Sequence, residues 1–133
     1  MDSSLKKRIE KLITQARQLL KNLHIHRYDV DEYRALVRLE GKWYQYRVFI
    51  TMIYRANETT RYSYHILDKQ NKHVHRFDNS ADKTAIKLRH QTDWKPHQHE
   101  ETPHQHDAQG KITLTESISF ERFVAWLTKN CPI

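Results

Sequence analysis

The N-terminal segment, residues 1–26, has the hydrophobic pattern of an amphipathic helix. Its apolar side chains recur at steps of three and four residues and are Leu5, Ile9, Leu12, Ile13, Ala16, Leu19, Leu20 and Leu23. Because an α-helix has about 3.6 residues per turn, this spacing forms one stripe and predicts a helix over about residues 4–23. Such a stripe has to be buried on a sheet, on a partner protein or on a second copy of the chain.

Residues 33–78 alternate between apolar and polar side chains, which is the period of a strand with one buried face. Short polar stretches divide this region into four predicted strands, at residues 33–39, 43–55, 61–67 and 73–78. We expect Gly41 to form the turn of the first hairpin, since glycine adopts the positive φ that tight turns need. Strands that follow one another with short links form an antiparallel meander.

Residues 79–110 are mostly polar and are predicted to form a long, histidine-rich loop. After them, residues 111–130 are predicted to form a short strand and a helix, for which Ser119 is a suitable N-cap. All 133 residues are therefore predicted to belong to a single α+β domain. Its expected architecture is an antiparallel β-meander of four to five strands with an N-terminal and a C-terminal helix packed on it.

The charge of the chain is positive and uneven. The net charge is +7, and residues 1–61 hold 13 Lys and Arg against 7 Asp and Glu. This excess either keeps the protein in solution or attracts a polyanion, which would be nucleic acid or an acidic protein. No stretch approaches the ~20 apolar residues of a membrane span, and a single cysteine cannot form an internal disulfide. We therefore expect a cytoplasmic protein with no membrane partner.

Histidine is the most unusual residue in the composition. Ten are present, five of them within residues 90–106. Four pairs are separated by a single residue, where chance would give about one, and these pairs are His24/His26, His73/His75, His97/His99 and His104/His106. In an extended segment the two members of such a pair point to the same side.

Two imidazoles could cleave RNA by acid–base chemistry, because histidine titrates near neutral pH. One imidazole would take the proton of the 2′-hydroxyl, and the other would give a proton to the leaving 5′-oxygen. We assign these roles to His97 and His99. A cation would stabilise the charge that builds on the phosphate, and Arg76, Arg89 or Lys95 could supply it.

The histidines fit two other interpretations. Imidazole is a common zinc ligand and carboxylates lie nearby within residues 93–107, although no spacing matches a known zinc signature. The histidines could also form a solvated loop without function, which is the interpretation that we favour for His24/His26 and His104/His106. We therefore expect no cofactor, with zinc or another divalent metal as the alternative.

The fourth predicted strand ends in the sequence Arg76-Phe77-Asp78-Asn79. An acid and an amide at a strand end can orient a histidine of the following loop, so Asp78 and Asn79 join Arg76 among the candidate catalytic residues. The same two residues could instead form a simple Asx turn, in which the side chain hydrogen-bonds to the backbone two residues further on.

The order of these parts resembles the TumE-type toxins of bacterial type II toxin–antitoxin systems. The resemblance depends on Arg61–Lys72, on Arg76–Asn79, on the step Pro96-His97-Gln98-His99 and on the terminal helix, and it is best over residues 61–99. It implies a small growth-inhibiting toxin that a neighbouring antitoxin neutralises, and its motif places Asp78, Asn79, His97 and His99 in the site. Cleavage of messenger RNA is implied by analogy. The long N-terminal helix and the wide loop depart from the family pattern.

The sequence thus predicts a metal-independent endoribonuclease toxin in which loop histidines transfer protons. The expected partners are RNA and a cognate antitoxin, and the N-terminal helix could also join two copies into a homodimer. The alternatives are a non-enzymatic basic module that binds an acidic antitoxin or regulator, and a metal-dependent nuclease whose histidines hold the ion. The cations expected to hold RNA are Lys11, Arg17, Lys21, Arg34, Arg38, Arg47, Arg89 and Lys95.

Overall fold

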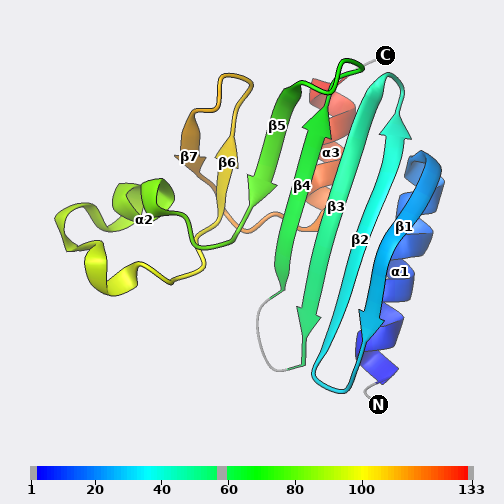
Figure 1. Cartoon of the computed structure of the whole chain (residues 1–133), viewed down its shortest axis with the longest axis horizontal. Coiled ribbons are helices and arrows are strands. Elements are labelled where there is room, and N and C mark those ends of the chain that lie inside the picture. Colours follow the sequence, from blue (N-terminus) through cyan, green and yellow to red (C-terminus); the bar gives the residue numbers. More distant parts are fainter. Residues whose placement is uncertain (1–2, 57–59, 132–133) are drawn as a thin grey trace.

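The computed structural model describes residues 3–56 and 60–131, which form seven strands and three α-helices. These elements are shown in Figure 1, coloured along the chain. In chain order they are α1 (Ser3–Leu19), β1 (Lys21–Val30), β2 (Arg34–Trp43), β3 (Tyr46–Arg55), β4 (Arg61–Leu67), β5 (His73–Asp78), α2 (Lys83–His90), the 3-10 turns η1 (Gln91–Asp93) and η2 (Lys95–His97), β6 (His104–His106), β7 (Ile112–Leu114) and α3 (Phe120–Asn130).

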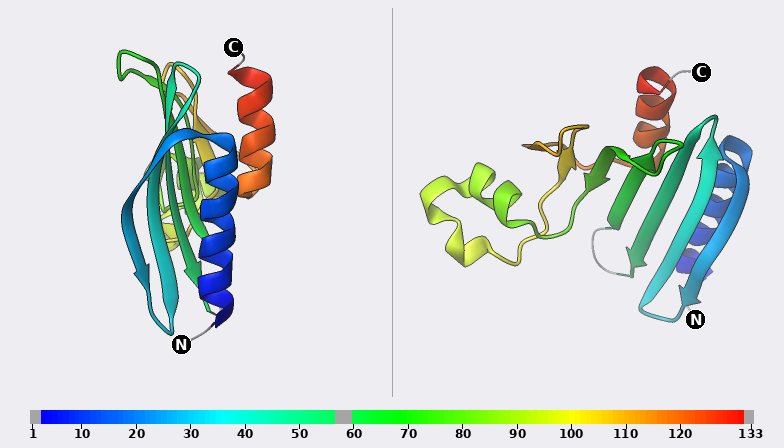
Figure 2. Two further views of the ribbon diagram at one scale, coloured as in Figure 1. Left: turned by 90° about the vertical axis from the view of Figure 1, so that its right-hand side faces the viewer. Right: turned by 45° about the horizontal axis from the view of Figure 1, so that its top comes forward.

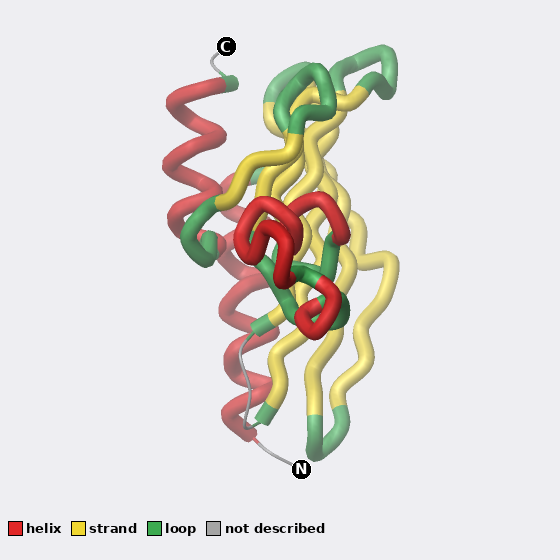
Figure 3. Tube along the Cα trace, turned by 90° about the vertical axis from the view of Figure 1, so that its left-hand side faces the viewer, coloured by secondary structure: helices red, strands yellow, loops and turns green. Residues whose placement is uncertain are grey.

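The seven strands form one antiparallel sheet in the order β1 to β7, so each strand lies beside the next one in the sequence. This meander with an N-terminal and a C-terminal helix confirms the predicted α+β class, although four to five strands were predicted. Both α1 and α3 cover the same side of the sheet, as Figures 2 and 3 show. Among the described residues, no helix has the length and apolar character needed to cross a membrane.

The hydrophobic core lies between the sheet and these two helices. The predicted stripe of α1 is buried there, with Leu5, Ile9 and Leu12 at its centre, and every second residue of β2, β3 and β4 faces it. From α3, the ring of Phe123 stacks on Tyr64 with ring centroids 4.7 Å apart. The stripe is thus buried on the chain's own sheet, which leaves only the other faces of α1 for the predicted homodimer or for a partner protein.

The N-terminal helix is shorter than predicted. It ends at Leu19, and the chain then reverses into β1, which begins at Lys21 and forms the edge of the sheet. Asn22 has a positive φ of 54° at this reversal, a conformation that asparagine adopts more readily than most residues. The prediction of a helix to residue 23 was wrong because the pattern changes here to a strand-like alternation, in which Leu23 and Ile25 alternate with histidines.

Gly41 does not form the first hairpin turn. It lies inside β2, where it pairs with Val48, and the turn is formed by Tyr44 and Gln45. A Cβ atom on Gly41 would lie 2.7 Å from the Cβ of Leu20, closer than side chains approach in real structures. Glycine is therefore required here because the end of α1 comes close to the strand, and not because of the backbone angle of a turn.

Residues 79–110, predicted as a loop, contain regular structure. In this region α2, η1 and η2 form a lobe, residues 80–101, which stands beyond β6 and β7 in Figure 1, and β6 then joins the sheet. The helix α2 was missed because its eight residues are too few to show a periodic stripe, and its buried residues are Ala85 and Ile86.

Two contacts close the base of the lobe. The backbone N–H of Thr102 donates to the carbonyl of Asn79 at 3.1 Å, and the carboxylate of Glu101 pairs with the guanidinium of Arg55 in β3 at 2.5 Å. The two ends of the lobe therefore meet at the sheet, and the lobe is an insertion between β5 and β6.

Candidate functional site

One face of the sheet is not covered by the helices α1 and α3, and we call it the open face (Figures 2 and 3). Successive side chains of a strand point to opposite sides, so the residues between the core positions point to this face. Most of them in β2 to β5 are charged or polar, and they include Arg38, Glu40, Thr51, Arg61, Ser63, His65, Arg76 and Asp78.

The register of the strands aligns these side chains in rows across the sheet. In one row His65 pairs with Arg76, and Arg76 pairs with His106 of β6. In the next row Asp78 pairs with His104 of β6. Residues that pair in register point to the same face, so β6 places two histidines beside Arg76 and Asp78 on the open face.

His104 is the most constrained of these residues. Its exposed fraction is 1%, and its Nδ1 lies 2.6 Å from the backbone carbonyl of Thr102. Because a carbonyl oxygen only accepts hydrogen bonds, Nδ1 must carry a proton and donate it. The neutral ring then has its lone pair on Nε2, which can accept a proton or bind a metal ion.

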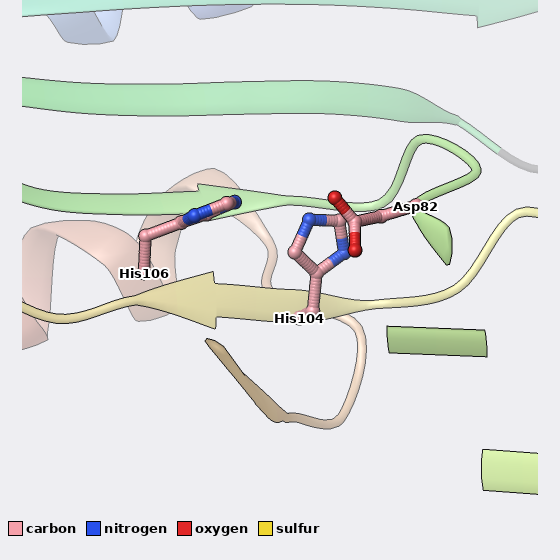
Figure 4. A group of neighbouring side chains, drawn as sticks. All are labelled: Asp82, His104 and His106. Atoms are coloured by element: carbon pink, nitrogen blue, oxygen red, sulfur yellow. The ribbon is translucent and has the colours of Figure 1, made fainter. Parts of the chain in front are cut away.

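His106 and Asp82 complete a cluster with His104. The two rings have centroids 5.1 Å apart and planes inclined by 64°. Figure 4 shows both rings rising from the same side of β6, with the carboxylate of Asp82 beside the ring of His104. One ligand atom from each of the three residues lies within 4.8 Å of the others. Asp82 also caps α2, since its Oδ1 accepts a hydrogen bond from the backbone N–H of Ala85 at 2.9 Å.

Arg76 is held in place by Asp78. Its Nη2 donates to Oδ2 of Asp78 at 2.6 Å, and the backbone N–H of Ser80 donates to Oδ1 at 2.6 Å. Burial by itself raises the pKa of Asp78, but the hydrogen bonds from Ser80 and the charge of Arg76 outweigh it and hold the pKa below its usual range. The contact with Ser80 is the Asx turn considered above, so the carboxylate orients Arg76 rather than a lobe histidine.

A shallow groove of about 290 Å³ runs along the open face next to this ion pair. Three guanidinium groups line it, from Arg38, Arg61 and Arg76, and Arg38 and Arg61 are exposed. A surface of this kind can hold the phosphates of an extended polyanion, since cations spaced along a groove follow a charged backbone.

A second histidine pair lies on the same face. His73 has its Nε2 2.7 Å from the carbonyl of Asp107, so this nitrogen donates, and its Nδ1 accepts from Nε2 of His65 at 3.0 Å. Burial lowers the pKa of His65 to about 4, and the charges of His73, Arg76 and His106 contribute to the shift.

This shift predicts a loss of stability in mild acid. Between about pH 6.5 and pH 4 the unfolded chain holds a proton on residue 65 that the folded chain does not hold, so the free energy of unfolding falls as the pH decreases through this window. The variant His65→Gln retains a donor toward His73 but cannot titrate. Urea unfolding at pH 7 and pH 4.5 should show a smaller loss for His65→Gln than for the wild type, and equal losses would contradict the assignment.

His97 and His99, the histidines predicted to be catalytic, lie in the lobe and not beside Asp78 on the open face. The ring of His97 stacks on that of His90, with centroids 3.6 Å apart, and its Nδ1 lies 2.7 Å from the carboxylate of Glu100. His99 is exposed. The hydrogen bond with His97 lowers the pKa of Glu100. The strand register thus places His104 of β6 beside Asp78. His97 instead contacts His90 and Glu100 inside the lobe.

Asn79, also predicted to be catalytic, has its side chain fully engaged in backbone contacts. Its Oδ1 accepts from the N–H of Tyr62 at 2.9 Å, and its Nδ2 donates to the carbonyl of Thr60 at 2.8 Å. The residue is 5% exposed. These contacts join the end of β5 to β4, so Asn79 has a structural role in the fold.

The eight cations predicted to hold RNA do not form one surface. Lys11 and Arg17 are exposed on α1, on the covered side of the sheet, whereas Arg38 and Arg47 lie on the open face. Arg47 is paired with Glu40 at 2.6 Å. The other four are Lys21 and Arg34 at the starts of β1 and β2, and Arg89 and Lys95 in the lobe.

The sequence contained one signal for the residues that were missed. The tetrapeptide Pro-His-Gln-His occurs twice, at residues 96–99 and at residues 103–106. From the sequence we assign the catalytic roles to the first copy and interpret the second as part of a solvated loop. His104 and His106 were therefore visible as an equivalent candidate, but the pairing of β5 with β6 is needed to show that this copy meets Arg76 and Asp78.

The open face thus combines imidazole, carboxylate and guanidinium groups within one short stretch of sheet. Comparisons with known protein families, curated proteins and solved structures find no match to this chain. The groups themselves can move protons, hold a cation and bind phosphate oxygens, which are the operations required to cleave a phosphodiester bond.

Proposed function

We propose that this chain is an endoribonuclease whose site is the open face around β5 and β6. The observation that supports this proposal is the strand register, which sets His104 and His106 beside Arg76 and Asp78. The proposed site contains the second copy of Pro-His-Gln-His, in β6, and not the lobe histidines His97 and His99 that the sequence predicts. The class of reaction, cleavage of RNA, stays as predicted.

The groove beside the ion pair is the proposed binding surface for RNA. Its guanidinium groups at Arg38 and Arg61 would contact phosphates on the way to Arg76. Single-stranded RNA fits this surface because an exposed sheet face lets an extended strand lie across several β-strands. Phe49, on the same face and only partly buried, is a candidate for stacking with a base.

The proposed reaction is a transesterification, in which the 2′-oxygen attacks the adjacent phosphate and the 5′-oxygen of the next nucleotide leaves. The 2′-hydroxyl gives its proton to one imidazole of the pair His104 and His106 as its oxygen bonds to phosphorus. The bond from phosphorus to the 5′-oxygen breaks, and the leaving oxygen takes a proton from the other imidazole. The guanidinium of Arg76, already oriented by Asp78, stabilises the negative charge that builds on the phosphate.

The biological role that we propose is that of a toxin in a type II toxin–antitoxin system. The support is the resemblance over residues 61–99, together with the Pro-His-Gln-His step. A cognate antitoxin would neutralise the protein in the cytoplasm by covering the open face, because the apolar stripe of α1 is already buried. Growth arrest on induction, relieved by a site variant, is the observation expected of such a toxin.

Paired variants on the two sides of the sheet test where RNA binds. The double variant Arg38→Ala/Arg61→Ala should weaken binding of a single-stranded RNA at least ~10-fold and reduce the salt dependence by about 0.7 per lost phosphate contact. The matched control Lys11→Ala/Arg17→Ala removes the same number of charges from α1 and should leave both quantities unchanged. Fluorescence anisotropy over a range of salt concentrations measures them.

Two results would contradict the proposed RNA surface and the proposed nuclease activity. If the α1 variant lost binding and the groove variant retained it, the open face would not be the RNA surface. If purified protein bound RNA without producing new ends, the non-enzymatic binding module would replace the nuclease. Gel mapping of end-labelled RNA, which identifies a cyclic phosphate and a 5′-hydroxyl, distinguishes cleavage from binding.

A further inference from the structure

We propose that Asp82, His104 and His106 bind one divalent transition-metal ion of the zinc type. Their ligand atoms lie within 4.8 Å of one another, and the three residues come from two separate elements, the start of α2 and the strand β6 (Figure 4). The inference goes beyond the proposed function because it names the cofactor of the same site, and it depends on that function only for its catalytic consequence.

The orientation of the two rings suits a shared ion. His104 and His106 are separated by one residue on a strand, so both point to the same side, and their planes are inclined by 64°. A metal ion lies near the plane of each imidazole that binds it, and two inclined planes can meet at one point. The rings of His90 and His97, with Glu100 the other candidate group, are 3.6 Å apart and nearly parallel at 5°, so one ion cannot lie in both planes.

The ligands are also held in place by their other atoms. Nδ1–H of His104 donates to the carbonyl of Thr102, which fixes the tautomer and leaves the Nε2 lone pair for an ion. A second hydrogen bond of this kind is usual for histidines that bind metals, because it orients the ring. Asp82 is fixed in the same way, since one of its oxygens accepts from the N–H of Ala85 and the other is left for coordination.

The charge around the cluster favours a cation. Asp78 pairs with Arg76 and offsets its positive charge, and Asp82 adds a second carboxylate directly to the cluster. Two nitrogen ligands and one oxygen ligand are typical of zinc and its neighbours, whereas calcium and magnesium prefer oxygen alone. Three protein ligands leave a position open, which is the arrangement of catalytic rather than structural zinc sites. An ion there would polarise an oxygen of the cleaved phosphate, and water in its open position would then take the place of the two metal-bound imidazoles in proton transfer.

Metal titration of the full chain tests the site directly. Protein treated with EDTA and then dialysed should bind one Zn²⁺ per chain in isothermal titration calorimetry, and Co²⁺ should give the visible absorption of a nitrogen- and oxygen-bound ion. Asp82→Asn keeps a residue that caps α2 but removes the charge, and His106→Gln removes a ring that is only partly buried. Each variant should weaken Zn²⁺ binding by at least ~10-fold.

The matched control is the double variant His90→Ala/His97→Ala, which should leave the affinity for Zn²⁺ unchanged. Binding that is lost in this control and kept in Asp82→Asn and His106→Gln would move the site to the lobe and overturn the inference. Absence of stoichiometric binding by the wild type would do so as well. Circular dichroism of each variant establishes that it is folded before the titration.

Measurements of Zn²⁺ binding and of RNA cleavage distinguish a missing metal site from a missing nuclease activity. RNA cleavage that persists in EDTA, by protein that binds no Zn²⁺, would overturn the metal site and leave a metal-independent nuclease. Stoichiometric Zn²⁺ binding at Asp82, His104 and His106 without any RNA cleavage would support the metal site and contradict the proposed function. Cleavage that EDTA stops and Zn²⁺ restores would support both.

Discussion

Replacing His104 with asparagine is expected to abolish RNA cleavage without unfolding the protein. The amide nitrogen of asparagine can take the place of Nδ1 and donate to the carbonyl of Thr102, so the buried contact is kept. No atom of asparagine reaches the position of Nε2, where a proton or a metal ion would bind. The initial rate with end-labelled RNA should fall by at least ~10²-fold, since this is the scale of a lost acid–base group or metal ligand.

The repeated tetrapeptide provides the control for this experiment. His97→Asn changes the same residue of Pro-His-Gln-His, at residues 96–99, and should retain the wild-type rate. Thermal unfolding of both variants checks that the fold is kept. If His97→Asn lost activity while His104→Asn kept it, the site would lie in the lobe, as predicted from the sequence, and the open face would have no catalytic role.

Replacing Asn79 with alanine is expected to destabilise the fold strongly without removing the chemistry. The change leaves the buried N–H of Tyr62 and the carbonyl of Thr60 without their side-chain partners. We expect the free energy of unfolding to fall by about 2–4 kcal/mol, because a buried N–H and a partly buried carbonyl lose their hydrogen bonds together. Urea unfolding monitored by tryptophan fluorescence measures this change.

The comparison for this variant is Asn130→Ala at the end of α3, where the amide donates to the carbonyl of Trp126 in an exposed position. Its effect on stability should be small, about 0.5 kcal/mol or less. The cleavage rate of Asn79→Ala, measured well below its unfolding transition, should stay close to that of the wild type. A large loss of rate with unchanged stability would restore Asn79 to the catalytic residues.

The hydrophobic pattern predicts those elements that have one buried face. The strands β2 to β5 and the stripe of α1 were found because apolar residues such as Val37, Ile50 and Leu12 recur at the strand and helix periods. The edge strand β1 has mostly exposed residues, and β6 is the three residues His104–His106 with no apolar side chain. The alternation in β1 is limited to residues 23–26, and β6 is defined only by its backbone pairing with β5 and β7, so a local hydrophobic pattern predicts neither strand.

The candidate site was predicted in its residue types but not in its location. Arg76 and Asp78 were identified at the end of a strand, and a Pro-His-Gln-His step was expected to meet them. Which of the two steps does so is decided by the pairing of Asp78 with His104, residues far apart in the sequence. The contribution of Asp82 could not be foreseen either, because the helix that it caps was not predicted.

The insertion of the lobe between β5 and β6 has a consequence for control of the site. The lobe begins and ends at one point, where Thr102 donates to Asn79, and its helix α2 contacts β7 of the sheet. Asp82 belongs to the lobe, whereas His104 and His106 belong to the sheet. The distance between the carboxylate and the two imidazoles therefore depends on how α2 is seated against β7, so a substitution in that contact would disturb the three-residue cluster and leave Arg38 and Arg61 of the groove in place.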